Sequence, residues 1–172
     1  MVKLYRCEIC GDPYIGENPP DRCPFCGVYV KYIKEAKEAK VNFDVELSAK
    51  DRTNVEHALQ VEISNATFYQ CAAKETDDEE GRQLFKILKK VEAEHASVWK
   101  KILKLDQVPA GDDSCHVSNK ENLEDSHARE TKAIEFYTKA TGEADNARIK
   151  QIFQAFVEVE TDHLHLSEVR LK

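Results

Sequence analysis

The sequence lacks any long uninterrupted run of apolar residues. No stretch approaches the roughly 20 apolar residues that a membrane-spanning helix needs, and residues 1–6 contain no apolar segment of signal-peptide length. We therefore expect a cytoplasmic protein without a membrane partner. A basic surplus is also missing, because the formal net charge is −7. This charge disfavours nucleic acids and anionic membranes as partners.

Cysteine is concentrated at one end of the chain: four of the six cysteines fall within the first 26 of 172 residues. They form two Cys-x-x-Cys pairs, each followed by a glycine. Disulfide frameworks rarely show this pattern, whereas two such turns can surround a tetrahedral ion with four thiolates in a reducing compartment. We predict a four-cysteine metal site made of Cys7, Cys10, Cys23 and Cys26. Because this spacing suits Zn as well as Fe, a purely structural zinc ribbon is an open alternative.

The composition divides the chain into three segments. Residues 1–34 are rich in turn residues, which leave space only for short strands. A module this small depends on its metal to fold. Residues 35–47 form a linker, and residues 48–172 form a helical domain. The expected miniature core of the module consists of Tyr5, Tyr14, Phe25 and Tyr32.

Capping signals divide the helical domain into four helices. Ser48 and Ser118 each begin a capping box, and Asp77-Asp78 places negative charge at a helix N-terminus. Gly142 is expected to end the third helix. The segment 106–118 is rich in Pro, Gly and Asp, and it is long enough to cross the length of a bundle. The expected helices span residues 48–75, 79–105, 118–141 and 144–170.

Two Glu-x-x-His pairs lie in the second and fourth expected helices: Glu92 with His95, and Glu160 with His163. Residues three apart share one helix face, so each pair can bind one ion with two side chains. Both glutamates interrupt apolar stripes without a compensating lysine or arginine. An ionised carboxylate in such a place costs roughly several kcal/mol unless a cation neutralises it. A metal is the simplest partner.

The first and third helices each add one glutamate on their inner faces, Glu62 and Glu130. Together with the two pairs they give the six-ligand plan of carboxylate-bridged di-iron and di-manganese bundles. Carboxylates with one imidazole per metal suit Fe or Mn better than Zn or Cu. We expect Glu92 and Glu160 to bridge the two ions and Glu62 and Glu130 to be terminal ligands.

Two tyrosines support this assembly. Tyr69 follows Glu62 by seven residues, and Tyr137 follows Glu130 by seven, so each lies two turns along the same face. Each phenol is expected to donate a hydrogen bond to a ligand carboxylate of the opposite helix. The bundle thus reads as two repeats of one helix pair.

Several other residues are expected to stay outside the metal shell. His127 shares the face of Glu130, and a supporting or core role is favoured over direct ligation. Glu94 is expected to be solvated. Cys71 is expected to be a small core residue and Cys115 a loop thiol. The remaining histidines, His57, His116 and His165, are expected at the surface or its boundary.

With both sites located, the sequence resembles the rubrerythrin family, in which a rubredoxin-like iron module is joined to a ferritin-like di-iron bundle. The resemblance covers nearly the whole chain. Because the cysteine module precedes the bundle, the order is similar to that of reverse-order rubrerythrins. The resemblance implies a mainly α fold, a ferritin-like four-helix bundle with a small N-terminal rubredoxin-like domain. It also implies non-haem iron, one ion in the four-cysteine site and two in the bundle, with Zn or Mn as substitutes.

The resemblance also implies a function. Rubrerythrins reduce hydrogen peroxide in oxidative-stress defence, using electrons passed through the rubredoxin-like iron. We therefore expect peroxide or oxygen as substrate, an external electron-donor reductase, and a homodimer or tetramer. In that oligomer, the module of one chain is expected to approach the bundle of another.

One position departs from the family pattern. Rubrerythrins typically carry a further glutamate three residues after the counterpart of Glu130, where this chain has Ala133. The ligand plan is thereby closer to that of ferritins, so a ferroxidase or iron-handling bundle is the first alternative. A zinc-ribbon interaction module on a helical bundle is the second. The four-cysteine site favours the peroxide reductase, because an iron-storage protein needs no one-electron relay.

Overall fold

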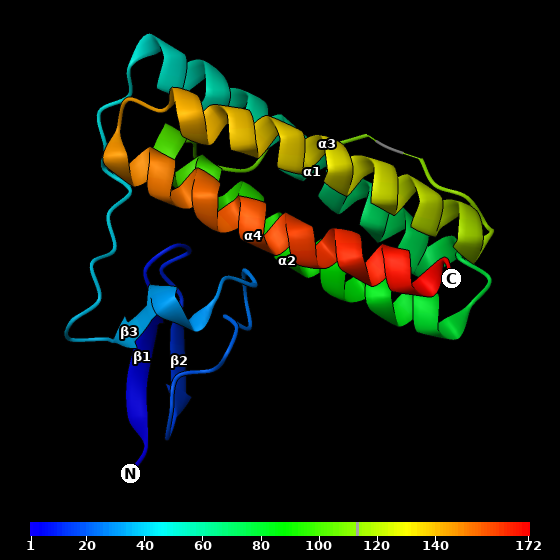
Figure 1. Ribbon diagram of the computed structural model, residues 1–172, viewed down its shortest axis with the longest axis horizontal. Helices are drawn as coiled ribbons and strands as arrows, with labels where there is room; N and C mark the ends of the chain where they lie inside the picture. Colours follow the sequence, from blue (N-terminus) through cyan, green and yellow to red (C-terminus); the bar gives the residue numbers. More distant parts are fainter. Residues whose placement is uncertain (113) are drawn as a thin grey trace.

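Four long antiparallel helices form a bundle in the computed structural model, which describes residues 1–112 and 114–172 (Figure 1). Helix α1 packs mainly against α2, and α3 packs mainly against α4, whereas α1 and α3 touch little. The mainly helical fold class with a small cysteine-bearing sheet is therefore confirmed. Within the described residues no helix is both long and apolar enough to cross a bilayer. The helices are α1 (Ala49–Glu75), α2 (Glu79–Leu103), α3 (Asn119–Glu143) and α4 (Ala147–Arg170).

Side-chain caps begin the helices where the sequence predicts them. Ser48 accepts a hydrogen bond from the Asp51 N–H at 3.1 Å, and Ser118 accepts one from the Glu121 N–H at 3.3 Å. Asp78 likewise accepts from the Gly81 N–H at 2.6 Å. These bonds satisfy backbone donors that have no partner inside the helix. The second helix ends at Leu103, where Lys104 adopts a left-handed conformation.

The turn between α3 and α4 differs from the expectation. Gly142 lies inside α3, which continues to Glu143, and α4 begins at Ala147. The buried Asp51 carboxylate accepts hydrogen bonds from the N–H groups of Asp145 and Asn146, both at 3.1 Å. A contact distant in sequence therefore fixes this turn, and the glycine does not.

The N-terminal module is a three-stranded antiparallel sheet in the order β2-β1-β3. The strands are β1 (Lys3–Cys7), β2 (Pro13–Gly16) and β3 (Ile33–Glu35). Tyr5 and Tyr32 are buried and Tyr14 is partly buried, as expected for a miniature core. Phe25 is 40% exposed, so its expected place in that core is wrong. It stands between Pro24 and Cys26, and buried cysteines occupy the inner positions of this turn.

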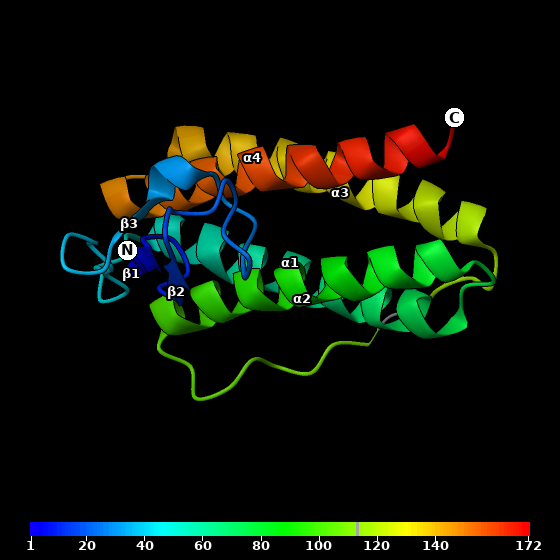
Figure 2. The same cartoon turned by 90° about the horizontal axis from the view of Figure 1, so that it is seen from below.

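The module lies against α2 and α4, close to the ends where α1 and α4 begin (Figures 1 and 2). One continuous set of buried side chains joins the two parts. The approach is close at Gly27, where an added Cβ would lie 3.0 Å from Val159 Cγ1 and where φ is +76°. Only glycine fits there without strain. The segment between α2 and α3 runs along the bundle outside α1 and α2 (Figure 2), as its length predicts.

Cys71 and Cys115 form a disulfide bond between α1 and the segment before α3. Their expected roles as a core residue and a loop thiol are therefore wrong. Cys115 packs against the buried group around Phe68 and Phe85. A pairing 44 residues apart in the sequence leaves no local pattern that could reveal it.

The double substitution Cys71→Ser/Cys115→Ser should lower the free energy of unfolding by about 2–4 kcal/mol, because the unfolded chain regains the freedom of a long loop. Denaturant unfolding followed by circular dichroism measures this change. Mild reduction of the unsubstituted protein serves as the control and should match the double variant. Identical unfolding of oxidised protein and double variant would contradict a structural role for this bond.

Candidate metal centres

The four N-terminal cysteines converge in one buried site. Their sulfur atoms all lie within 4.8 Å of one another. Cys7 and Cys26 are 3.7 Å apart at Sγ, and Cys10 and Cys23 are 3.8 Å apart. Hydrogen bonding to Cys23 and burial raise the pKa of Cys10, so four thiolates do not form here without a cation. The arrangement fits a single tetrahedral ion.

The backbone around the cysteines has the turn geometry that the glycine spacing predicts. Gly11 and Gly27 both have positive φ, at +89° and +76°. The Asp12 N–H faces Cys10 Sγ at 3.4 Å. Such amide contacts stabilise thiolate charge and tune a bound ion.

The six predicted donors of the bundle are brought together in its core. They form two sets whose ligand atoms lie within 4.8 Å of one another: one of Glu62, Glu92, His95 and Glu160, the other of Glu92, Glu130, Glu160 and His163. Every member is buried. The two sets share Glu92 and Glu160, which are the residues expected to bridge.

The oxygens of the shared glutamates divide between the two histidines. Glu92 places Oε1 2.9 Å from His163 Nδ1 and Oε2 3.7 Å from His95 Nδ1. Glu160 places Oε2 2.9 Å from His163 Nδ1 and Oε1 3.2 Å from His95 Nδ1. Each carboxylate thus turns one oxygen toward each end of the site, as a bridging ligand must. Glu62 and Glu130 each face one histidine only.

The two tyrosines make the hydrogen bonds that their spacing predicts. Tyr69 on α1 donates to Glu130 Oε1 on α3, and Tyr137 on α3 donates to Glu62 Oε1 on α1. Burial and the neighbouring carboxylates raise both phenol pKa values well above 10, so both stay protonated donors. Each phenol leaves the second carboxylate oxygen free for a metal. Further contacts come from Ser126 to Tyr69 at 2.8 Å and from Trp99 Nε1 to Tyr137 at 3.3 Å.

His95 connects the two metal sites. Its Nε2 lies 2.9 Å from the backbone carbonyl oxygen of Cys26, in the four-cysteine site. A carbonyl only accepts, so Nε2 carries a proton, and Nδ1 is the nitrogen that faces the three glutamates and could bind a metal once it has lost its own proton. The module was expected to approach the bundle of another chain. The structure brings the two sites together within one chain, and an approach of the module to the bundle of another chain stays a prediction.

The donor atoms themselves indicate that cations belong here. Within the described residues, eight buried atoms of the six donors have no hydrogen-bond partner: Glu62 Oε2, both oxygens of Glu92, Glu130 Oε2, both oxygens of Glu160, and Nδ1 of each histidine. Unsatisfied buried polar atoms are rare and costly. Two divalent ions at the centre would satisfy all of them, so the residues fit the predicted dinuclear site.

Burial dominates the electrostatics of the site. It raises the pKa values of Glu62 and Glu130 well above the ordinary range, and the neighbouring carboxylates act in the same direction. Burial also opposes ionisation of Glu92, but attraction to His163 and His95 outweighs it and lowers the pKa. Burial opposes the charged form of both histidines, yet the surrounding carboxylates raise their pKa values. Metal-free protein therefore holds protons where metals would bind.

Two residues near the site differ from their expected positions. His127 is 41% exposed and lies 3.7 Å from Glu168, so it does not support the dinuclear site. Ser126 occupies that position and contacts Tyr69. Glu94 is not solvated: its side chain is 23% exposed and lies 3.6 Å from Lys101 at the boundary with the module. Burial and Asp12 raise the Glu94 pKa to about 7.

Comparison with known proteins agrees with this architecture. No family model matches the chain. The chain is 26% identical over 113 residues to "Reverse rubrerythrin-1" of Clostridium acetobutylicum, covering 59% of this chain and 62% of that relative. The match thus spans less than two thirds of the length of this curated relative. At this level the expected resemblance is confirmed: the chain is a distant homologue of a reverse rubrerythrin.

A similar solved structure supports the fold alone. It is a hypothetical protein from Pyrococcus furiosus, with a TM-score of 0.52 and 17% sequence identity. The superposition covers 72% of this chain and 88% of that protein.

The metal-free bundle should lose stability as pH rises. Glu62 and Glu130 have pKa values above the ordinary 4.5 in the folded state. Their stabilisation of the folded state is therefore fully present below about pH 4.5 and is lost as the pH rises through the folded-state pKa values. His95 and His163 act in the same direction above about pH 6.5, and Glu92 acts oppositely only below about pH 4.5. Melting temperatures from about pH 5 to about pH 8 test this, with metal-loaded protein as the control. If the melting temperatures of metal-free and metal-loaded protein changed with pH in the same way, the assignment of these residues as metal ligands would be contradicted.

The substitution Tyr137→Phe should weaken metal binding at the Glu62 end of the site by roughly 10- to 100-fold, because Glu62 loses the hydrogen bond that orients it. Competition with a chromophoric chelator measures the two affinities. Tyr14→Phe in β2 is the matched control and should bind as the unsubstituted protein does. Equal affinities in all three proteins would show that the phenol does not position the carboxylate.

Proposed function

We propose that this protein is a non-haem di-iron peroxide reductase that receives its electrons through iron in the four-cysteine site. The observation that carries the proposal is the 2.9 Å hydrogen bond between His95 Nε2 and the Cys26 carbonyl oxygen. It joins a one-electron site to a two-metal site through one side chain. A bundle that only stored or oxidised iron would not need this connection.

The chemistry requires two electrons and two protons for each hydrogen peroxide reduced to two waters. Two adjacent ferrous ions would supply both electrons to a bound peroxide. Glu92 and Glu160 belong to both donor sets and would hold such a pair together. Tyr69 and Tyr137 stay protonated and fix the terminal carboxylates, so the site keeps its geometry as its charge changes.

Electrons are proposed to enter from an external reductase at the module. From Cys26 the route to the bundle runs through its own main chain, one hydrogen bond and the His95 ring. Gly27 permits this approach, because a side chain there would meet Val159. Exchange of modules between subunits is therefore not needed for electron delivery, whatever homo-oligomer the protein forms.

A ferroxidase is the second candidate, and Ala133 is the observation that favours it. This residue is buried one turn from Glu130 and offers no ligand, so the described donors number six, as in the ferritin plan. In that case oxygen, and not peroxide, is the oxidant. The rates with the two oxidants therefore separate the candidates.

Anaerobically reduced, iron-loaded protein should be oxidised by hydrogen peroxide at least tenfold faster than by oxygen at equal concentration, which is about 1.4 kcal/mol in activation free energy. Stopped-flow absorbance of the di-ferric centre measures both single-turnover rates. Oxidation by oxygen at an equal or higher rate would support the ferroxidase and overturn the peroxide reductase.

A matched variant tests the electron relay. Cys10→Ser removes one sulfur of the module but leaves the Cys26 carbonyl in the chain. Its single-turnover oxidation by peroxide should persist, whereas continuous turnover with an external reductase should fall by roughly a hundredfold or more. Iron content of both sites is measured alongside. Unchanged continuous turnover in protein lacking module iron would contradict the relay.

A further inference from the structure

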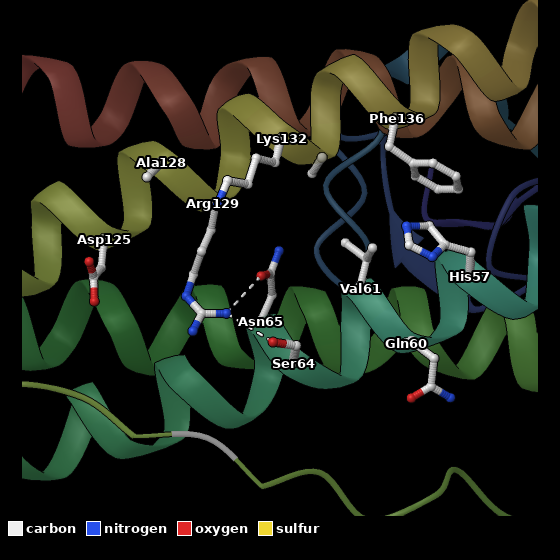
Figure 3. Close-up of a pocket in the computed structure, with 11 residues that line it drawn as sticks. His57, Gln60, Val61, Ser64, Asn65, Asp125, Ala128, Arg129, Lys132 and Phe136 are labelled. Atoms are coloured by element: carbon white, nitrogen blue, oxygen red, sulfur yellow. Dashed lines mark hydrogen bonds between the residues drawn. The ribbon is translucent and has the colours of Figure 1, made fainter.

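A pocket of about 540 Å³ opens between α1 and α3, on the side where these helices touch little (Figure 3). One water molecule occupies about 30 Å³ of liquid. The pocket is therefore many times larger than hydrogen peroxide requires, and it lies in the range of small-molecule sites. Its size indicates a ligand with an organic group.

The inner end of the pocket lies about one helical turn from the two terminal carboxylates, and none of the six donors lines it. Two of its lining residues, Asn65 and Ala133, are 3% and 2% exposed. Asn65 follows Glu62 by three residues, and Ala133 follows Glu130 by three, so each lies on the helix face of a terminal carboxylate. The module covers the opposite side of the site, through α2 and α4. The pocket thus lies on the side of the bundle that the module does not cover, and the buried Asn65 and Ala133 form its boundary toward the donors.

Asn65 provides a fixed hydrogen-bond donor at this inner end. A guanidinium group contains only N–H donors. Arg129 donates to Asn65 Oδ1 at 3.5 Å and to Ser64 Oγ at 3.0 Å (Figure 3). This contact turns the amide nitrogen of Asn65 away from Arg129. Within the described residues, Nδ2 is buried and has no hydrogen-bond partner. A buried donor of this kind requires an acceptor, and an oxygen of a bound ligand fits.

The remaining walls combine the apolar side chains of Val61, Ala128 and Phe136 with four polar or charged ones, His57, Gln60, Asp125 and Lys132. Val61 projects from α1 into the space between the helices, and Phe136 faces it from α3 (Figure 3). His57 packs edge-on against Phe136, with ring centroids 4.5 Å apart. A ligand that fits has an oxygen-rich end at Asn65 and an apolar group between Val61 and Phe136.

We propose that the α1–α3 pocket binds organic hydroperoxides and presents their peroxide group to the dinuclear site. This rests on the proposed function, which it extends from hydrogen peroxide to a substrate class, ROOH. The O–O bond breaks as two electrons arrive from the external reductase through the module and two protons are taken up. The products are one alcohol, ROH, and one water. Asn65 Nδ2 donates to the peroxide group, and the organic group occupies the pocket.

Kinetics with two peroxides test the assignment. Iron-loaded protein should reduce cumene hydroperoxide as well as hydrogen peroxide. Val61→Phe should lower the ratio of kcat/KM for cumene hydroperoxide to kcat/KM for hydrogen peroxide by roughly tenfold or more, because it fills the pocket. Val169→Phe, on an exposed part of α4, should leave the ratio unchanged. Reduction of hydrogen peroxide without reduction of cumene hydroperoxide overturns the proposal, and so does an unchanged ratio in Val61→Phe.

Equilibrium binding separates this proposal from the function on which it rests. The alcohol product of cumene hydroperoxide, 2-phenyl-2-propanol, should bind iron-loaded protein in a calorimetric titration, and Val61→Phe should weaken that binding by roughly tenfold. Asn65→Leu should weaken it by roughly five- to tenfold through loss of one hydrogen bond. Binding without peroxide reduction retains the pocket as a ligand site but removes its substrate role. Absence of binding, or equal binding by the unsubstituted protein, Val61→Phe and Asn65→Leu, would contradict a ligand site in this pocket.

Discussion

The structure depends on the burial of six metal-binding side chains in the centre of a helical bundle. Four carboxylates and two imidazoles lie there almost without access to solvent, and within the described residues several of their atoms have no hydrogen-bond partner. Such a group of acids destabilises an apolar core unless cations neutralise it. The tyrosine contacts across the bundle follow from this constraint, because each terminal carboxylate must be held with one oxygen toward the centre. The bundle is therefore best understood as a fold completed by its metals.

The contact between the module and the bundle is a second consequence of the same site. His95 can present Nδ1 to a metal only if Nε2 keeps its proton, and the Cys26 carbonyl fixes that state. Partly exposed ion pairs surround the contact, including Arg22 with Asp162 at 2.7 Å and Lys31 with Glu158 at 2.6 Å. Pairs of this kind contribute only about 0–1 kcal/mol each. The buried histidine and the close approach at Gly27 therefore define how the module sits.

The sequence predicts the features that depend on local spacing. Glu-x-x-His pairs, cysteine pairs and helix caps each use residues within one or two turns, so the four helices and the members of both metal sites could be read directly. The tyrosine contacts could also be predicted, because the two tyrosines follow their glutamates at the same interval in both halves.

What could not be predicted depends on contacts distant in sequence. The Cys71–Cys115 bond, the role of Asp51 at the α3–α4 turn and the intrachain position of the module are of this kind. His127 shows that helical spacing alone does not decide which of two neighbouring residues faces the core. Ser126 points inward and contacts Tyr69, whereas His127 lies near Glu168 at the surface.

The two sides of the bundle, one formed by α2 and α4 and the other by α1 and α3, differ although the two halves of its sequence are repeats. Helices α2 and α4 supply both histidines and both shared glutamates, and the module covers them. Helices α1 and α3 supply one carboxylate each, touch little, and border a pocket. The α2–α4 side, which supplies most of the ligands, thus faces the proposed source of electrons. The α1–α3 side, which supplies fewer ligands, carries the pocket that is open to solvent. A substrate that approached from α2 and α4 would have to displace the module and the hydrogen bond that orients His95. Approach between α1 and α3 displaces no ligand and meets only the small side chain of Ala133 and the amide of Asn65 at the inner end of the pocket.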